Sequence, residues 1–228
     1  MQSPVSHKIL DQQFWLTTDR TMYWEEEKAL IVSDLHFGKT GHFRKSGIAI
    51  PASVYKEDLQ RLILQIQYFQ PKELIIVGDM FHSYANRELD LFLKWWSDLP
   101  ETPIRLIRGN HDILEEKWYA DAGIHLSRQT FSRQQFHFVH DITDHLGGKA
   151  GFTVPAAGSR SYFFSGHIHP GIRIQGAGKQ SLCFPCFYFG KKYAVLPAFS
   201  RFTGVAMIYP EAEEQVFAIV NRELIRMQ

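Results

Sequence analysis

Five short polar motifs in the sequence contain residues of the types that bind metal ions. In chain order they are Asp34-Leu35-His36, Gly78-Asp79, Gly109-Asn110-His111-Asp112, His140 and Gly166-His167-Ile168-His169. They supply two carboxylates, one amide and four imidazoles as candidate ligands: Asp34, His36, Asp79, Asn110, His140, His167 and His169. This set is large enough for two metal ions that share one carboxylate. Nitrogen and oxygen ligands without thiolate suit Mn²⁺, Fe²⁺, Zn²⁺ or Co²⁺ better than Ca²⁺.

The order of these motifs carries more information than any one of them. In this composition an Asp-x-His pair is expected about 0.5 times by chance, whereas Gly-Asn-His-Asp is expected roughly 5 × 10⁻⁴ times. Scattered polar residues of a core or a surface would not produce five motifs in a fixed order. The ordered set is therefore typical of a functional site.

Each motif directly follows a short apolar run that polar or glycine residues bound. The runs cover residues 29–33, 74–77, 104–107, 136–139 and 162–165. Their length and their content of β-branched or aromatic residues predict buried strands. Sites in open α/β sheets form at the carboxyl ends of the strands. The candidate ligands should therefore converge.

Helical patterns separate the first three of these strands. Apolar residues recur at steps of three and four over residues 55–69, and Pro71 ends this helix. A second pattern covers residues 89–99, with Asn86 as its N-cap and Pro100 beyond its end. Alternating strands and helices predict an α/β fold. The last part of the chain predicts three closely spaced, antiparallel strands at residues 193–196, 205–209 and 215–219.

Composition limits the class of protein. The 228 residues carry 25 Lys and Arg against 24 Asp and Glu, so no broad positive field attracts nucleic acid or a membrane surface. The apolar runs are far shorter than the roughly 20 residues that a membrane helix needs. Two cysteines and an N-terminus without an apolar leader favour a reducing, cytoplasmic location. We expect a single domain over residues 1–228.

The five motifs resemble those of the calcineurin-like metallophosphoesterase superfamily, whose order is D-x-H, G-D, G-N-H-D/E, H and G-H-x-H. This resemblance implies a four-layer α/β/β/α sandwich in which helices flank two mixed sheets. It implies that the first of two metal ions is bound by Asp34, His36, Asp79 and His169. It assigns the second ion to Asp79, Asn110, His140 and His167.

The resemblance also implies a mechanism. Two ions about 3.5–4 Å apart would clamp a phosphoryl group and lower the pKa of a bridging water, whose hydroxide attacks phosphorus in line. His111 would protonate the leaving oxygen, Asp112 would orient His111, and Arg108 would stabilise negative charge. The sequence departs from the family's frequent pattern where Asp141, not glycine, follows His140. His137 and His145 therefore remain alternative ligands.

Further motifs resemble a bacterial subfamily, the ligase-associated DNA damage response endonucleases (PdeM). They are residues 34–39, Phe43-Arg44, residues 47–51, and the later motifs Phe184-Pro185-Cys186-Phe187, Leu196-Pro197-Ala198-Phe199 and Phe202-Thr203-Gly204. This subfamily implies DNA as substrate, a role in DNA repair, and functional association with a DNA helicase and an ATP-dependent DNA ligase. We take Mn²⁺ as the first choice of metal.

Residues near the first motif are candidates for substrate contacts. Lys39, Arg44, Lys45 and His82 are expected to bind phosphate, and Phe37 and Phe43 are candidates for base stacking. Lys191, Lys192 and Arg201 are weaker candidates for phosphate contact. Two other functions remain open: hydrolysis of small nucleotides or other phosphate esters, and a non-catalytic scaffold of the same fold. A scaffold would usually lose ligands or the acid, and this chain keeps both.

Overall fold

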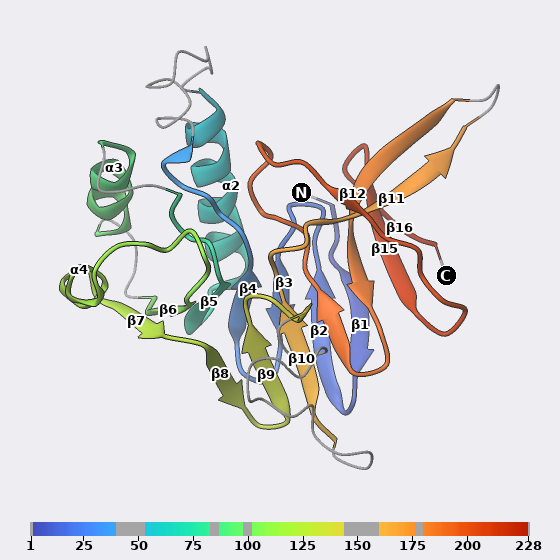
Figure 1. Ribbon diagram of the computed structural model, residues 1–228, viewed down its shortest axis with the longest axis horizontal. Coiled ribbons are helices and arrows are strands. Elements are labelled where there is room, and N and C mark those ends of the chain that lie inside the picture. Colours follow the sequence, from blue (N-terminus) through green and yellow to red (C-terminus); the bar gives the residue numbers. More distant parts are fainter. Residues whose placement is uncertain are drawn as a thin grey trace.

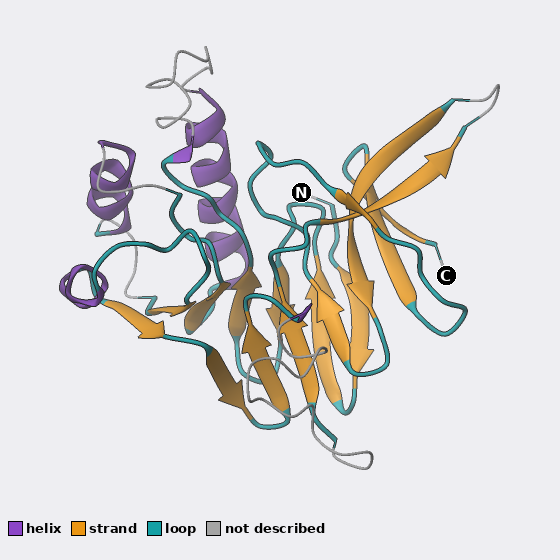
Figure 2. Ribbon diagram, viewed as in Figure 1, coloured by secondary structure: helices purple, strands orange, loops and turns teal. Residues whose placement is uncertain are grey.

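The computed structural model describes residues 2–39, 53–82, 87–97, 102–143, 160–176 and 180–227, with only the backbone at residues 53–55, 87 and 88. Two β-sheets pack face to face, and helices cover the outer face of the first (Figures 1 and 2). None of the described helices is long and apolar enough to cross a membrane.

The first sheet has seven strands that lie in chain order. They are β1 (Val5–Ile9), β2 (Gln12–Leu16), β3 (Met22–Trp24), β4 (Ala29–Val32), β5 (Glu73–Val77), β6 (Ile104–Ile107) and β7 (Ile124–Ser127). Strands β1 to β4 form an antiparallel meander, and β4 to β7 are parallel. The carboxyl ends of β4, β5 and β6 therefore lie side by side, where the first three polar motifs begin.

The second sheet has nine strands in the order β14-β11-β12-β13-β10-β9-β8, with β15 on β12 and β16 on β15. Their bounds are β8 (Thr130–Arg133), β9 (Phe136–Val139), β10 (Tyr162–Ser165), β11 (Pro170–Gln175), β12 (Ser181–Phe189), β13 (Tyr193–Val195), β14 (Ala206–Met207), β15 (Gln215–Val220) and β16 (Glu223–Arg226). Strands β9, β10 and β13 are parallel. The β11–β12 hairpin projects beyond the rest of the sheet (Figure 1).

Three apolar layers stabilise this arrangement. Between the sheets lies an aromatic core in which Phe14, Trp24, Phe136 and Phe164 are fully buried. The helices α2 (Ser53–Phe69), α3 (Arg87–Trp96) and α4 (Glu116–Asp121) pack their apolar sides on the outer face of the first sheet. A smaller cluster covers the outer face of the second sheet.

The expected pair of mixed sheets is confirmed, with the described helices on the outer face of the first sheet. The five strands that precede the polar motifs form within one residue of their predicted bounds. The prediction for the last three strands is partly wrong. Only β15 is antiparallel to both neighbours, because β13 also pairs in parallel with β10, and β14 pairs in parallel with β11. The predicted helix signals at Asn86 and Pro100 lie outside the described residues.

Candidate metal centre

The candidate ligands come together at the ends of strands from both sheets. Two groups have ligand atoms that all lie within 4.8 Å of one another: Asp34, His36 and His169, and Asp79, His140 and His167. We call them the Asp34 triad and the Asp79 triad. Their carboxylates follow β4 and β5 of the first sheet, whereas His140 follows β9 of the second sheet. His167 and His169 follow β10.

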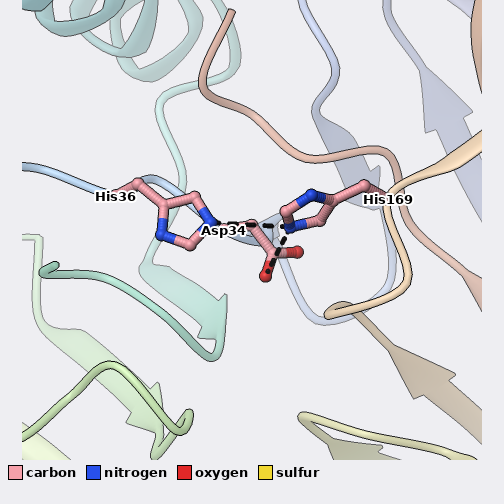
Figure 3. Close-up of side chains that lie close together, drawn as sticks. All are labelled: Asp34, His36 and His169. Atoms are coloured by element: carbon pink, nitrogen blue, oxygen red, sulfur yellow. Dashed lines mark hydrogen bonds and ion pairs between the residues drawn. The ribbon is translucent and has the colours of Figure 1, made fainter. Parts of the chain in front are cut away.

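The Asp34 triad converges on a single point (Figure 3). The Nε2 atoms of His36 and His169 are 3.5 Å apart, and the His169 Nε2 lies 3.4 Å from Oδ1 of Asp34. Asp34 is fully buried and His36 is 5% exposed. Burial, followed by the nearby charge of Lys39, lowers the pKa of His36 to about 2. The imidazole is therefore neutral at physiological pH, which is the form that binds a metal ion.

The Asp79 triad has the same character, and the amide of Asn110 lies beside it. His140 Nε2 lies 2.9 Å from Oδ1 of Asn110, 3.5 Å from Oδ2 of Asp79 and 3.1 Å from Nδ1 of His167. The main-chain N–H of His167 also donates to both oxygens of Asp34 at 3.1 and 3.2 Å, so the two triads adjoin. Burial raises the pKa of the Asp79 carboxyl, and the His140 imidazole opposes that shift.

These distances fit divalent metal ions. Metal–ligand bonds of about 2.0–2.2 Å place neighbouring ligand atoms roughly 3–3.5 Å apart. The His140 and His167 ring nitrogens, 3.1 Å apart, form a hydrogen bond when one of them carries the N–H proton, and both can bind a cation when neither does. The donor set therefore fits one ion per triad.

Five of the seven candidate ligands have positive backbone φ angles. They are Asp34 (52°), His36 (50°), Asp79 (49°), His167 (64°) and His169 (52°). A non-glycine residue in this region is uncommon, and such residues cluster at functional sites where the surrounding structure holds them. The turns after β4 and β10 thus aim alternate side chains, and the turn after β5 aims Asp79, into one space.

Glycine is required where main chain passes close to the ligands. A Cβ at Gly78 would lie 1.8 Å from Nδ1 of His140, and φ at Gly78 is +79°. A Cβ at Gly109 would lie 2.1 Å from Oδ1 of Asp79, and one at Gly166 would lie 2.6 Å from Oδ2 of Asp34. No side chain fits at these positions.

A segment far along the chain forms the wall behind Asp34. The Phe199 N–H donates to the Ser33 carbonyl at 2.8 Å, and the Ser200 N–H donates to the Asp34 carbonyl at 3.2 Å. The Ser33 hydroxyl donates to the Pro197 carbonyl at 3.2 Å. Residues 197–199 belong to one of the later subfamily motifs, so this part of the resemblance corresponds to support of the first metal motif.

Two arginines hold that segment. Arg20 donates to the carbonyls of Ala198 and Ser200 at 2.9 and 2.8 Å. Arg61, on α2, donates to the Phe199 carbonyl and forms a buried ion pair of 2.9 Å with Asp58. Its guanidinium also lies 4.2 Å from the centre of the Phe199 ring. Sequence reasoning missed both arginines, because neither belongs to a motif.

His111 lies beside the two triads. Its main-chain N–H donates to Oδ1 of Asp79 at 2.8 Å, and its ring centre is 5.6 Å from that of His36 and 4.1 Å from that of His82. His82 and His111 thus face the same space as the Asp34 triad. Lys39 also lies close to the two carboxylates. Burial lowers the pKa of its ammonium group, and the negative charges of Asp79 and Asp34 oppose that shift.

Asp112 and Arg108 are placed differently from the expectation. The Asp112 carboxylate accepts the N–H groups of Phe81 and Gly109 at 3.0 and 2.9 Å, so it ties the β5 loop to the β6 loop. Burial raises the pKa of this carboxyl to about 7. Arg108 donates to the carbonyls of Asp112 and Leu114 at 2.9 and 3.2 Å. Both side chains brace the loop that carries His111.

The remaining candidates divide into three groups. His137, on β9 and away from the triads, forms a hydrogen bond of 2.7 Å between its Nδ1 and the Ser132 hydroxyl. His145 lies outside the described residues. Arg44, Lys45 and Phe43 also lie outside them. The stacking prediction for Phe37 is wrong, because its ring is 1% exposed and packs in the core under the helices.

The basic residues near β13 are also displaced from the site. Tyr193, which follows Lys192, pairs with Phe163 near the start of β10, whereas the triads follow the end of β10. Lys191 forms an ion pair with Glu213. Arg201 lies 3.9 Å from Asp19, next to the segment behind Asp34.

Comparison with known proteins identifies the family. The model of the calcineurin-like phosphoesterases matches residues 28–175, well over half of the chain. The protein belongs to the calcineurin-like phosphoesterase family. The crystal structure of Pseudomonas putida nuclease MPE is similar, with 26% sequence identity, a TM-score of 0.75, and coverage of 95% of this chain and 96% of that chain. The E. coli phosphoesterase Yfce is 13% identical, with a TM-score of 0.43 and coverage of 87% and 97%. No curated protein sequence matches this chain.

Family membership gives the chemistry of the site its class. This phosphoesterase is a hydrolase of phosphate esters, and members of the family use divalent metal ions. Its two triads are candidate positions for such ions. The likeness to the nuclease spans nearly the whole chain, including the β-strands after His169.

Proposed function

We propose that this phosphoesterase is a dinuclear metal-dependent phosphodiesterase that cuts DNA internally. The observation that carries the proposal is the pair of adjoining triads, each with one buried carboxylate and two imidazoles. Two-metal sites of this kind suit phosphodiester hydrolysis, in which both the attacking and the leaving oxygen need stabilisation. The likeness to a nuclease supports a nucleic acid as the substrate class, and the subfamily motifs favour DNA.

The proposed ligand assignment combines the two triads with the ligand pattern of the resembling family. The first ion would be held by Asp34, His36, His169 and, as a shared ligand, Asp79. The second would be held by Asp79, Asn110, His140 and His167. The distances from His140 to Asn110 and Asp79 support His140 as the ligand from the fourth motif. Mn²⁺ is the first metal to test, and Fe, Zn and Co are compatible with the same donor set.

When bound, the two ions supply charge neutralisation at the phosphoryl oxygens and activate water as the nucleophile. The chain's own residues then have separate tasks. His111 holds a proton at its imidazole and delivers it to the leaving oxygen, and the bond from its N–H to Asp79 fixes its position. Lys39 and His82, which border the same space, bind the non-bridging oxygens and orient the substrate. We assign Arg44 and Lys45 the same task on the basis of sequence.

The biological setting rests on the subfamily motifs. They support a role in cytoplasmic DNA repair, in functional association with a DNA helicase and an ATP-dependent DNA ligase. Affinity capture with each of these enzymes, in the presence and absence of DNase, separates direct contact from a shared DNA substrate. Failure to recover either enzyme under both conditions would leave the nuclease proposal intact and contradict direct association.

Hydrolysis of end-labelled oligonucleotides tests the central proposal. Single- and double-stranded substrates are incubated with Mn²⁺, with an EDTA control and with a bis-aryl phosphate in the same buffer. We expect internal cuts that require metal and that disappear in Asp79→Asn, because this change removes the carboxylate charge that the proposal assigns to both ions. If the oligonucleotides stay intact while the bis-aryl phosphate is hydrolysed, the enzyme acts on small phosphate esters instead.

Substitution of His111 tests the acid. His111→Ala should retain bound metal and slow turnover by roughly 10²–10⁴-fold, the usual contribution of a general acid. The loss should be greater for a substrate with a poor leaving group than for one with a good leaving group. His125→Ala, at an exposed position on β7, is the matched control. Equal losses on both substrates would contradict the acid role.

A further inference from the structure

The stretch of chain that carries His167 and His169 has an unusual charge. Residues 145–210 contain no Asp or Glu, although the average composition of the chain would place about seven there. The remainder of the chain carries 18 basic and 24 acidic residues, a formal charge of −6. The basic stretch itself has a formal charge of +7, from Lys149, Arg160, Arg173, Lys179, Lys191, Lys192 and Arg201.

The β11–β12 hairpin belongs to this basic stretch and starts at the metal centre. Strand β11 begins directly after His169, and the hairpin projects beyond the rest of the second sheet (Figure 1). Two main-chain hydrogen bonds of 2.9 Å fix its base: the Ala206 N–H donates to the His169 carbonyl, and the Ile208 N–H donates to the Gly171 carbonyl. The hairpin therefore extends from a candidate metal ligand in a defined direction.

The two faces of the hairpin differ in character. Ile172 and Ile174 belong to the apolar cluster on the outer face of the second sheet. Arg173 lies on the other face, because side chains alternate along a strand, and it is exposed. Among the described residues its guanidinium forms no ion pair. At about 3.3 Å per residue, Arg173 lies roughly 13 Å along the chain from His169.

An exposed aromatic ring follows the neighbouring strand. Strand β14 is parallel to the start of β11, with Met207 opposite Gly171. Tyr209 follows Met207 by two residues, as Arg173 follows Gly171, so both residues come just beyond the end of this pairing. At 84% exposure, Tyr209 is the most exposed of the large apolar and aromatic side chains in the described part of the chain. Its ring is thus open to a ligand.

An arginine near an exposed aromatic ring suits a strand of nucleic acid. Arginine contacts phosphate oxygens, and such contacts position the strand without reading its sequence. An aromatic ring stacks on any base that is not paired. A small phosphate ester bound at the metal centre would not span the roughly 13 Å to Arg173. The two residues therefore serve a polymer and not a small substrate.

We propose that the DNA strand next to the cleaved bond lies along the β11–β12 hairpin. Arg173 binds a phosphate a few nucleotides from the cleaved bond, and Tyr209 stacks on an unpaired base. This inference rests on the proposed function, because it assigns a path to the substrate of the same metal centre. The hairpin binds the strand and takes no part in the chemical step.

Binding measured in EDTA tests the path apart from cleavage. The probe is a fluorescently labelled single-stranded oligonucleotide of roughly 20 nucleotides, longer than the usual binding site of about 4–16. Fluorescence anisotropy gives its dissociation constant over a range of salt concentrations. Arg173→Gln should weaken binding about tenfold, since it removes a charged hydrogen-bond donor. The slope of log K against log salt should become shallower by about 0.7, which corresponds to one phosphate contact.

Arg160→Gln is the matched control for Arg173. Arg160 is exposed and belongs to the same basic stretch, but it precedes β10, whereas His167 and His169 follow the end of that strand. Its substitution should leave both the dissociation constant and the salt slope unchanged. Equal weakening by Arg160→Gln and Arg173→Gln would reflect total charge alone and would overturn the path.

Substitutions of Tyr209 test the stacking contact. Tyr209→Ala should weaken binding about tenfold, the usual loss of one base–aromatic contact. Tyr209→Phe keeps the ring and should bind like the unmodified protein. Tyr68→Ala, at an exposed position on α2, is the control and should have no effect. Equal weakening by Tyr209→Ala and Tyr209→Phe would contradict stacking.

The outcomes separate this path from the nuclease proposal. If the protein cuts DNA with Mn²⁺ but Arg173→Gln and Tyr209→Ala bind as tightly as the unmodified protein, the nuclease proposal stands and the path is wrong. If the variants weaken binding as expected but no DNA is cut, the path stands as a binding surface and the nuclease proposal is wrong.

Discussion

The Asp34 triad and the Asp79 triad contain the same kinds of side chains but are supported in different ways. Main chain passes so close to both triads that no Cβ fits, at Gly78 and Gly109 beside the Asp79 triad and at Gly166 beside Asp34. The Asp34 triad has a further support from side chains in distant parts of the chain, since Arg20 and Arg61 hold the segment that backs Asp34.

This difference shows that one site can combine two sources of rigidity. The glycines of the motifs let the main chain approach the ligand side chains closely, and no added Cβ fits there. The ion pair of Arg61 with Asp58 has side chains only 8% and 5% exposed, so it depends on both partners being present. Substitution of a glycine beside the ligands should therefore reduce catalysis, whereas substitution in the buried ion pair should reduce stability.

The largest effect is expected at the buried ion pair. Arg61→Met leaves Asp58 buried without its main counter-charge, which should lower the free energy of unfolding by about 3–5 kcal/mol. Urea unfolding in EDTA measures this change apart from any bound metal. Arg128→Met removes an ion pair whose side chains are 76% and 46% exposed, and should cost less than about 1 kcal/mol. Similar losses in the two variants would contradict the distinction between the supports.

An intermediate effect is expected at Gly109. Gly109→Ala forces the new methyl group away from Asp79, and a displacement of about 1 Å in a catalytic site can slow turnover about 100-fold. Steady-state hydrolysis of the bis-aryl phosphate measures the loss. Gly204→Ala is the control, because nothing lies within 4 Å of the added atom. Turnover within twofold of the unmodified enzyme would show that the β6 loop can yield.

The smallest effect is expected at Asp112. Asp112→Asn keeps one oxygen that can accept a hydrogen bond, but its NH₂ group cannot accept from the second of the two N–H groups, those of Phe81 and Gly109. The unpaired N–H group should lower the free energy of unfolding by about 1–3 kcal/mol. Thermal unfolding, compared with Asp121→Asn at an exposed position, checks the value. An unchanged melting temperature would mean that Phe81 and Gly109 do not need this carboxylate.

The polar residues at the strand ends were predictable from sequence, because each follows a short apolar run that marks its strand. The short apolar runs predicted β4, β5, β6, β9 and β10, and the parallel order of β4 to β6 brings their polar ends together. The N-terminal meander escaped prediction. Strands β1 to β3 are three to five residues long, and their buried and exposed positions alternate only over that short length.

The supports of the site were not predictable, since they are long-range contacts. The hydrogen bonds from Arg20 to residues 198 and 200 join positions about 180 apart in the chain. The positive φ angles of Asp34 and His36 also leave no trace in residue type, because the fold as a whole holds them. The misplaced expectation for Asp112 has the same origin: its neighbour in sequence, His111, is not its partner in space.

Each triad takes its carboxylate from one sheet and its imidazoles at least partly from the other: Asp34 and His36 face His169, and Asp79 faces His140 and His167. An ion bound there would connect the two sheets of the sandwich, so metal binding and folding are linked equilibria. At a free concentration 100 times its dissociation constant, one such ion adds about 2.7 kcal/mol to the unfolding free energy. Shortage of the ion would then destabilise the folded protein as well as abolish its activity.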